Sequence, residues 1–358
     1  MTELEELRRE ILAIDEQLLA LLHRRNDAAR RIGVIKRGHN LPLQNFEVEK
    51  AVLDHALEAG AKLGVHPETT RDLVRILIQG SLRVQEKDQD GHLAKTGRTA
   101  LVVGGAGLMG TWFARFLEER GYDVYVDDPK PSTFPKGHPG DRAYDLVLVA
   151  TPPSTLPQIL ESLARQLPPA STLLDIGSVK GAGTEVLERH ARQGKRVASL
   201  HPMFGPKTEL LMGRNVLVLD AGNAAAAAAA GELFARTAAR THRLPLREHD
   251  PLMAEVLTLA HATSLAFNHA LASGRRPFSE LETFASTTFR RQVEVSREVA
   301  SENPRLYFEI QALNPASDAV LARLESSARD LRTIVKGKDE AGFVRYMEEG
   351  KRVYGGAT

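Results

Sequence analysis

The chain of 358 residues contains no cysteine. This absence excludes disulfide bonds, thiolate metal sites and a cysteine nucleophile, and it suits a reducing compartment. The net charge is only +1, so no overall field draws the chain to nucleic acid or to an anionic membrane. We therefore expect small-molecule partners rather than nucleic acid or membrane, and we predict no metal site.

Long apolar segments are also missing. No apolar run in the sequence reaches the roughly 18 residues of a membrane span, and the N-terminal segment is charged and amphipathic rather than built like a secretory signal. We expect a cytoplasmic protein. The length is too great for one typical core, so two or three domains are predicted.

Residues 1–88 show only helical patterns. Apolar residues recur at spacings of three and four across 4–35, which predicts one helix of about 35 residues. A second helix is predicted over 46–59 with Gly60 as its C-cap, and a third opens at Pro67. Three helices cannot bury so long an apolar stripe, so we expect a homodimer built on the long helix.

The most informative segment is 99–110, an apolar β-branched run followed by Gly105, Gly107 and Gly110. In this spacing, Gly105 permits a sharp turn, Gly107 lets the backbone approach a pyrophosphate, and Gly110 lets a helix pack closely on the strand. The N-terminus of that helix offers N–H groups to phosphates. The alternative is an ordinary tight glycine turn in an α/β domain.

A second predicted strand, 123–127, favours the dinucleotide interpretation. It ends beside Asp128, about 20 residues after the glycines, where a ribose hydroxyl is bound in this fold. A carboxylate there repels a 2′-phosphate, which favours NAD over NADP. Lys130 lies close enough to keep NADP open.

Alternating strands and helices predict a parallel sheet in 99–246. Strands are expected near 99–104, 123–127, 145–150, 171–176, 196–200 and 215–219. The alanine run 224–230 predicts a surface helix, with a low-complexity linker as the alternative. From about Glu248 onward only helical patterns occur, broken at Pro277, Pro304 and Pro315.

The predicted fold class is therefore multidomain. An all-α three-helix domain (1–88) and a linker (89–98) precede an α/β dinucleotide-binding Rossmann domain (99–246). An all-α domain (247–358) then supplies the substrate wall and a dimer interface.

Ligands of open parallel sheets bind at the carboxyl ends of the strands. There the third predicted strand is followed by Thr151 and Pro152, the fourth by Ser178, and the fifth by His201. A histidine at this edge can accept a hydrogen bond or proton from a hydroxyl whose carbon loses hydride. A buried structural histidine is the alternative, but two prolines and a glycine stiffen the loop that begins at His201.

Two of these loops resemble those of the prephenate dehydrogenase family. The resemblance covers about 99–350, and its segments are Gly-Leu-Met-Gly110, Asp175-x-x-Ser178-Val-Lys180, His201-Pro-Met-Phe-Gly-Pro206, Glu248-His-Asp250 and His261. It implies NAD-dependent oxidative decarboxylation of prephenate to 4-hydroxyphenylpyruvate, a step of tyrosine biosynthesis. His201 would hydrogen-bond the ring hydroxyl and promote departure of hydride, and Ser178 would contact that hydroxyl and the nicotinamide side. Arogenate as the substrate remains open.

The resemblance also assigns binding residues. The implied cofactor-binding set is Gly105, Gly107, Leu108, Met109, Gly110, Asp128, Thr151, Pro152 and Ser178. Prephenate is a dicarboxylate, and the family's anchoring arginine matches Arg297. The spacing from Arg297 to Pro304 is one residue longer than usual, so Arg290 and Arg291 stay open, and a solvated helix face is the alternative for each. His261 would line the side-chain end of the substrate, and Asp250 would belong to a gating ion pair.

A second candidate site lies in the helical N-terminal segment. Arg25 interrupts the apolar stripe, which is costly unless an anion meets it. Lys36 lies three turns later on almost the same face, and Ser81 and Gln85 share a face of the third helix. These residues predict a cationic pocket between helices, with snorkelling surface cations as the alternative.

Residues 4–86 resemble the all-helical chorismate mutase class, an intertwined dimer. The resemblance implies that chorismate is rearranged to prephenate here, and bifunctional chorismate mutase–prephenate dehydrogenases have this domain order. The implied roles are carboxylate binding by Arg25 and by Arg8 from the partner chain, ether-oxygen binding by Lys36 and Gln85, and hydroxyl and carboxylate binding by Glu49 and Ser81.

One departure weakens this second activity. At the start of helix two, Asn45 and Val48 stand where the family has an acid and an arginine. The alternative is a dehydrogenase whose N-terminal domain only dimerises or regulates. A third possibility, from another class, is a dinucleotide-sensing regulator.

Overall fold

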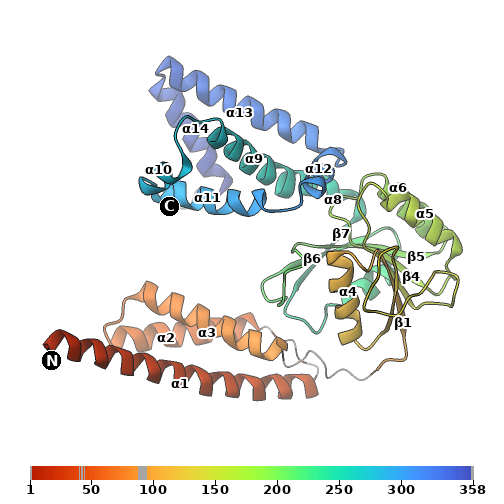
Figure 1. Cartoon of the computed structure of the whole chain (residues 1–358), viewed down its shortest axis with the longest axis horizontal. Helices are drawn as coiled ribbons and strands as arrows, with labels where there is room; N and C mark the ends of the chain where they lie inside the picture. The colour runs from red at the N-terminus through yellow and green to blue at the C-terminus, as the bar shows by residue number, and fades with distance from the viewer. Residues whose placement is uncertain (1, 40, 42, 44, 88–94, 356–358) are drawn as a thin grey trace. The chain divides into compact units, whose positions relative to one another are not determined.

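The computed structural model describes residues 2–39, 41, 43, 45–87 and 95–355. The described residues form two compact units, one lying within residues 1–151, 158–177 and 185–245, the other within residues 152–157, 178–184 and 246–358. A three-helix segment, then a sheet with helices, then a helical segment follow one another along the chain (Figure 1). The predicted fold class is confirmed.

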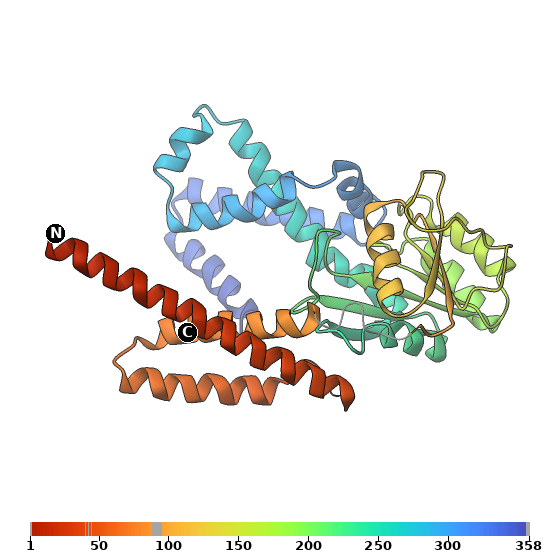
Figure 2. The same ribbon diagram turned by 60° about the horizontal axis from the view of Figure 1, so that its bottom comes forward.

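The first three helices are α1 (Glu3–Gly38), α2 (Phe46–Lys62) and α3 (Pro67–Lys87). They run side by side, and α1 extends beyond the other two (Figure 2). Gly60 is not the C-cap that the sequence predicted, because α2 continues to Lys62 and ends before Gly64, which has a φ of 71°. A Cβ on Gly60 would stand 2.6 Å from Thr70 Oγ1, so this glycine allows α2 and α3 to approach closely.

The predicted apolar stripe of α1 is exposed in the single chain. Its members Leu4, Leu7, Ile11, Ile14, Leu18 and Leu21 each leave about half of their surface open. An apolar face of this length is usually covered by a partner.

The sheet contains β1 (Thr99–Val103), β2 (Asp123–Asp127), β3 (Leu146–Val149), β4 (Thr172–Asp175), β5 (Arg196–Pro202), β6 (Asn215–Asp220) and β7 (Arg240–Pro245). Their order is β2-β1-β3-β4-β5-β6-β7. Strands β1 to β5 are parallel, whereas β6 runs antiparallel to β5 and pairs in parallel with β7.

The expectation of an entirely parallel sheet was therefore wrong at one edge. A parallel return to the sheet needs a long crossover, usually a helix, and residues 203–214 between β5 and β6 contain none. The sequence analysis also missed β7, because its Arg-Thr-His-Arg-Leu-Pro sequence is mostly exposed and lacks an alternating apolar pattern.

Helices α4 (Leu108–Glu119) and α7 (Ala224–Glu232) join one hydrophobic cluster with the sheet, in which Phe116 and Phe234 stack. The alanine run is thus a helix, but not purely a surface helix, since Ala226, Ala227 and Ala230 are buried. Helices α5 (Leu156–Gln166) and α6 (Gly183–Arg192) are linked by Glu161, which pairs with Arg189 and His190.

After β7 the chain is helical. The elements are η1 (Leu246–Glu248), α8 (His249–Met253), a π-helical turn η2 (Ala254–Thr258), α9 (Leu259–Ala272), α10 (Phe278–Thr283), α11 (Thr287–Ala300), α12 (Pro304–Ala312), α13 (Ser317–Gly337) and α14 (Glu340–Val353). The predicted breaks at Pro277, Pro304 and Pro315 all fall at helix boundaries.

Candidate active site

The glycine loop joins β1 to α4 through contacts that exclude side chains. The sequence assigned the sharp turn to Gly105, but the residue with a left-handed backbone is Gly104, with a φ of 80°. A Cβ on Gly105 would lie 2.7 Å from Val126, and a Cβ on Gly110 would lie 2.1 Å from Gly104 O. Gly105 and Gly110 therefore allow the loop and the helix to pack closely, because the neighbouring strand and loop leave no room for a side chain at either position. Sequence reasoning missed Gly104 because the spacing pattern does not include it.

The glycine loop and the start of α4 have the features of a dinucleotide-binding site. Gly107 is the N-cap of α4, and the Leu108 side chain is 79% exposed. The Asp128 carboxylate accepts a hydrogen bond from Ala106 N at 3.1 Å and another from Lys130 N at 2.8 Å. A helix N-terminus capped by glycine, beside an acid after β2, is the arrangement that binds pyrophosphate and ribose in this fold.

His201 is the penultimate residue of β5 and is only 3% exposed. Its position at the carboxyl end of a strand agrees with the prediction. Thr151 follows β3, and its methyl group would meet a Cβ on Gly104 at 3.0 Å. The carboxyl edge of this sheet therefore carries the glycine loop, Thr151 and the histidine.

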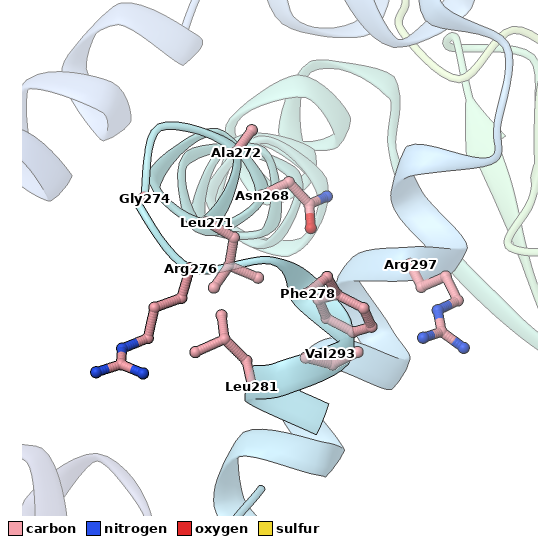
Figure 3. Close-up of a pocket in the computed structure, with 9 residues that line it drawn as sticks. All are labelled: Asn268, Leu271, Ala272, Gly274, Arg276, Phe278, Leu281, Val293 and Arg297. Carbon is pink, nitrogen blue, oxygen red and sulfur yellow. The ribbon is translucent and has the colours of Figure 1, made fainter. Parts of the chain in front are cut away.

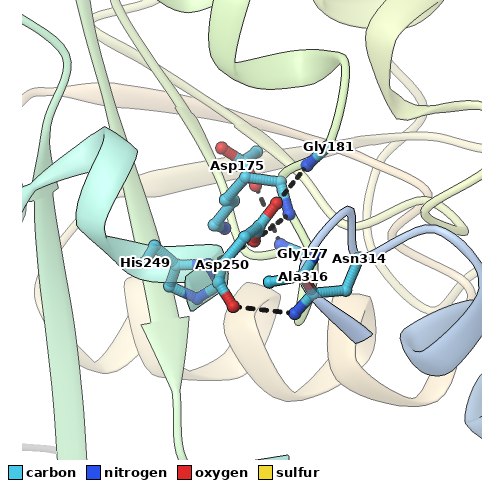
Figure 4. Close-up of polar contacts among 8 residues, drawn as sticks. Asp175, Gly177, Gly181, His249, Asp250, Asn314 and Ala316 are labelled. Carbon is cyan, nitrogen blue, oxygen red and sulfur yellow. Dashed lines mark hydrogen bonds and ion pairs between the residues drawn. The ribbon is translucent and has the colours of Figure 1, made fainter. Parts of the chain in front are cut away.

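In the second unit, Asp250 holds a loop rather than standing open to a ligand (Figure 4). Its carboxylate accepts hydrogen bonds from Lys180 N at 3.0 Å, from Gly181 N at 2.7 Å, and pairs with His249 Nδ1 at 2.7 Å. Asn314 Nδ2 donates to the Asp250 backbone oxygen at 2.8 Å. Although burial opposes ionisation, these hydrogen bonds lower the pKa of Asp250. The carboxylate fixes the segment that follows Ser178.

His261 on α9 stacks on Tyr307 of α12, with 4.3 Å between ring centroids. Its Nδ1 is buried and has no hydrogen-bond partner within the described part of the chain. Burial lowers the pKa of His261, and burial also raises the pKa of Tyr307. The sequence analysis missed Tyr307, because no motif marks it.

The candidate anchoring arginines lie on α11. Arg297 stands over the Phe278 ring at 5.7 Å, and its Nη2 lies 3.5 Å from Glu282 Oε1. It lines a pocket of about 470 Å³ with Asn268, Phe278 and other residues (Figure 3). Arg290 and Arg297 also line a neighbouring pocket of about 610 Å³. Arg291 is exposed and lines neither of these pockets.

Only some of the polar residues predicted for a pocket in the helical domain contact one another. Arg25 Nη1 donates to Leu77 O at 2.5 Å and to Ser81 Oγ, and Lys36 Nζ donates to Leu43 O at 2.5 Å. Burial lowers the pKa of Lys36, and the nearby Glu49 carboxylate opposes that shift. Burial likewise lowers the pKa of Arg25.

Gln85 is buried on α3, and its Oε1 has no hydrogen-bond partner among the residues that the structure describes. A buried amide oxygen of this kind marks a place for a donor. Arg8 is exposed on α1. It lies 17 residues before Arg25, roughly 25 Å along the helix.

The two departures at the start of α2 have different consequences. Asn45 is the N-cap, and its Oδ1 accepts hydrogen bonds from Glu47 N at 3.1 Å and Val48 N at 3.2 Å. Val48 is 57% exposed and contributes no charge to the site.

The described residues include neither a membrane-spanning helix nor a cluster of metal ligands. No helix among them is both long and apolar enough to cross a lipid bilayer. They also contain no group of three or more potential metal ligands from His, Asp and Glu.

Comparison with family models divides the chain into three segments. Residues 7–86 match chorismate mutase type II, residues 136–242 match the nucleotide-binding domain of prephenate dehydrogenase, and residues 246–349 match its dimerization domain.

Several curated proteins are similar. A "T-protein" of Enterobacter agglomerans is 26% identical over 99% of this chain and 94% of its own length. A "4-amino-4-deoxyprephenate dehydrogenase" of Streptomyces pristinaespiralis is 30% identical over 71% of this chain and 90% of its own. A "Probable arogenate/prephenate dehydrogenase" of Methanocaldococcus jannaschii is 27% identical over 74% of this chain, which spans only 62% of that relative.

A solved structure has the same fold. Prephenate dehydrogenase from A. aeolicus, in complex with hydroxyphenyl propionate and NAD+, superposes with a TM-score of 0.59 at 22% identity, over 72% of this chain and 98% of the other. With the three matched segments and the similarity over nearly the full length, the chain belongs to the prephenate dehydrogenase family and carries a type II chorismate mutase domain at its N-terminus.

Proposed function

We propose that this protein oxidatively decarboxylates prephenate to 4-hydroxyphenylpyruvate with NAD+, and that its helical domain makes prephenate from chorismate. The observation that carries the first activity is the buried His201 at the carboxyl end of β5, on the sheet edge that also carries the glycine loop. The prephenate dehydrogenase family supports the substrate, and the A. aeolicus relative in complex with NAD+ supports the cofactor.

The cofactor residues have separable tasks. The α4 N-terminus and Gly107 receive the pyrophosphate, and Asp128 accepts hydrogen bonds from the adenosine ribose. NAD+, when bound, takes up the hydride. Leu108, Met109, Thr151 and Pro152 stay proposed contacts of the cofactor.

The histidine acts on the hydroxyl at the carbon that loses hydride. Its imidazole accepts the hydroxyl hydrogen as the carbonyl develops. The ring carboxylate leaves as carbon dioxide, its bonding electrons enter the ring and reach the carbonyl oxygen, and that oxygen takes the proton back from the imidazolium to give a phenol. Because the ring becomes aromatic, the protein needs only to orient the substrate and support the developing carbonyl. Ser178 stays a proposed second contact of that hydroxyl.

Substrate anchoring requires cations, because prephenate carries two carboxylates. Arg297 is the proposed anchor and Arg290 the alternative, since both residues line the same pocket on α11. His261 is proposed at the side-chain end of the substrate. Asp250 is proposed to act indirectly, by holding the backbone of Lys180 and Gly181.

The mutase reaction needs no nucleophile. It needs a site that holds chorismate in its reactive conformer and stabilises the polarised ether oxygen. Lys36 and the buried Gln85 are proposed for the ether oxygen, Arg25 for a carboxylate, and Glu49 and Ser81 for the hydroxyl and a carboxylate. Arg8 is proposed to come from a second copy, since the apolar stripe of α1 is exposed. We accordingly propose a homodimer, which the matched dimerization domain also supports.

The decisive assay follows formation of NADH from prephenate and NAD+. His201→Asn should lower kcat by about two to four orders of magnitude, whereas His242→Asn, an exposed control on β7, should not. Unchanged turnover in the His201 variant would refute the assignment. Consumption of chorismate without NAD+ tests the mutase separately, and arogenate tested beside prephenate decides the substrate.

A further inference from the structure

The last turn of α3 carries a buried carboxylate that neither proposed reaction uses. Glu86 is only 6% exposed. Its Oε1 accepts a hydrogen bond from Leu211 N at 2.9 Å, and its Oε2 accepts one from Met212 N at 3.2 Å. A carboxylate is costly to bury unless such donors meet it, and charge-assisted bonds of this type are among the stronger ones in proteins.

The segment that Glu86 holds is the β5–β6 loop, residues 203–214, which begins two residues after His201. Leu211 is buried in the hydrophobic cluster of the sheet. At the other end of the loop, Phe204 packs against Trp112 of α4, with 5.0 Å between ring centroids. Trp112 Nε1 also donates to Thr208 O at 2.8 Å.

The loop is therefore fixed from two sides. Trp112 ties its first half to the helix that begins at the glycine loop, and Glu86 ties its second half to the helical N-terminal domain. Glu86 is also the direct neighbour of Gln85, the buried amide proposed for the mutase site.

We propose that Glu86 is a positioning residue for the dehydrogenase reaction. It holds the β5–β6 loop, and through that loop the backbone on which His201 is presented. The helical domain then serves the dehydrogenase directly, beyond making its substrate. The positioning role rests on the proposed function of His201. The contact of Glu86 with the backbone of Leu211 and Met212 does not depend on that function.

The first test measures the loop and not the reaction. Hydrogen exchange of the full-length protein should become faster in peptides that cover residues 207–214 when Glu86 is replaced by Gln, because an amide accepts only one of the two N–H groups well. Glu68→Gln, an exposed glutamate in the first turn of the same helix, is the matched control. Equal exchange in wild type and Glu86→Gln would overturn the proposal.

The second test separates positioning from folding. Glu86→Ala should lower the dehydrogenase kcat by about tenfold, because small misplacements of a catalytic group are costly. The KM for NAD+ and the mutase kcat/KM should stay within about twofold, and Glu86→Gln should fall between wild type and Glu86→Ala.

Two outcomes would contradict this second test. An unchanged dehydrogenase kcat would refute the positioning role. Parallel loss of both activities, with faster exchange across the whole chain, would reduce Glu86 to a general stabiliser. If the proposed function itself is wrong, His201→Asn will turn over prephenate at the wild-type rate. The hydrogen-exchange result for Glu86→Gln does not depend on that outcome.

Discussion

Asp128 accepts a hydrogen bond from the backbone N–H of Ala106 across 3.1 Å. The acid that follows β2 is thereby tied to the glycine loop that follows β1. The same carboxylate is the proposed partner of the adenosine ribose, so one side chain both shapes the loop and selects the cofactor.

Replacing Asp128 by Asn should weaken NAD+ binding by about tenfold, since a charge-assisted acceptor is lost. The preference for NAD+ over NADP+ should also fall, because the carboxylate no longer repels a 2′-phosphate. Calorimetric titration with both cofactors measures the two effects. Asp123→Asn, at the opposite end of β2, is the control, and an unchanged cofactor preference in Asp128→Asn would argue against the ribose assignment.

Gly110→Ala should damage both folding and cofactor binding. The added Cβ would stand 2.1 Å from Gly104 O, and backbone on both sides must shift to accept it. We expect a loss of about 1–3 kcal/mol of stability, together with NAD+ binding too weak to saturate. Gly140→Ala introduces a methyl group where no atom lies within 4 Å and should change neither. A Gly110 variant that binds NAD+ normally would show that the glycine loop does not hold the cofactor.

Arg25→Lys should reduce mutase kcat/KM by about a hundredfold, because a lysine cannot both keep the contacts that Arg25 Nη1 makes with Leu77 O and Ser81 and offer a carboxylate the paired N–H groups of a guanidinium. The dehydrogenase activity of the same sample should be retained. Arg24→Lys, an exposed neighbour, provides the control. If the wild-type protein consumes no chorismate, the missing charge at Val48 has abolished the activity, and the helical domain serves as a dimeriser or a regulatory module.

The half-buried His261 should make the protein sensitive to acid. Burial lowers its pKa in the folded state below the ordinary value of 6.5. Between the folded and unfolded pKa values the unfolded chain binds more protons, so stability falls as the pH drops below 6.5.

His261→Phe keeps an aromatic ring against Tyr307 and removes the titration. Its unfolding midpoint should therefore decline less than that of the wild type between about pH 7 and about pH 5. His269→Phe, on the exposed side of the same helix, should follow the wild type. Identical pH profiles for His261→Phe and the wild type would show that His261 does not titrate in the way its burial requires.

The sequence by itself determined the elements with a strong local signal. The period of α1, the order of strands around the glycine loop, and the position of His201 at a strand end all follow from side-chain patterning and turn chemistry, which act between near neighbours. The family resemblance, carried by short segments from the glycine loop to His261, then pointed to the substrate.

Only the tertiary structure decided the features that depend on distant neighbours. The polar, exposed β7 forms because β6 offers it a parallel partner, and β6 reverses because the preceding loop contains no crossover helix. Gly60 lies within α2, where the close approach of Thr70 from α3 leaves no room for a side chain. Tyr307 became a candidate because the His261 ring, 46 residues away in the sequence, stacks on it, and Glu86 because two backbone N–H groups, 125 and 126 residues away, donate to it. Local periodicity carries no information about such contacts, since they arise from packing between segments that the chain brings together only on folding.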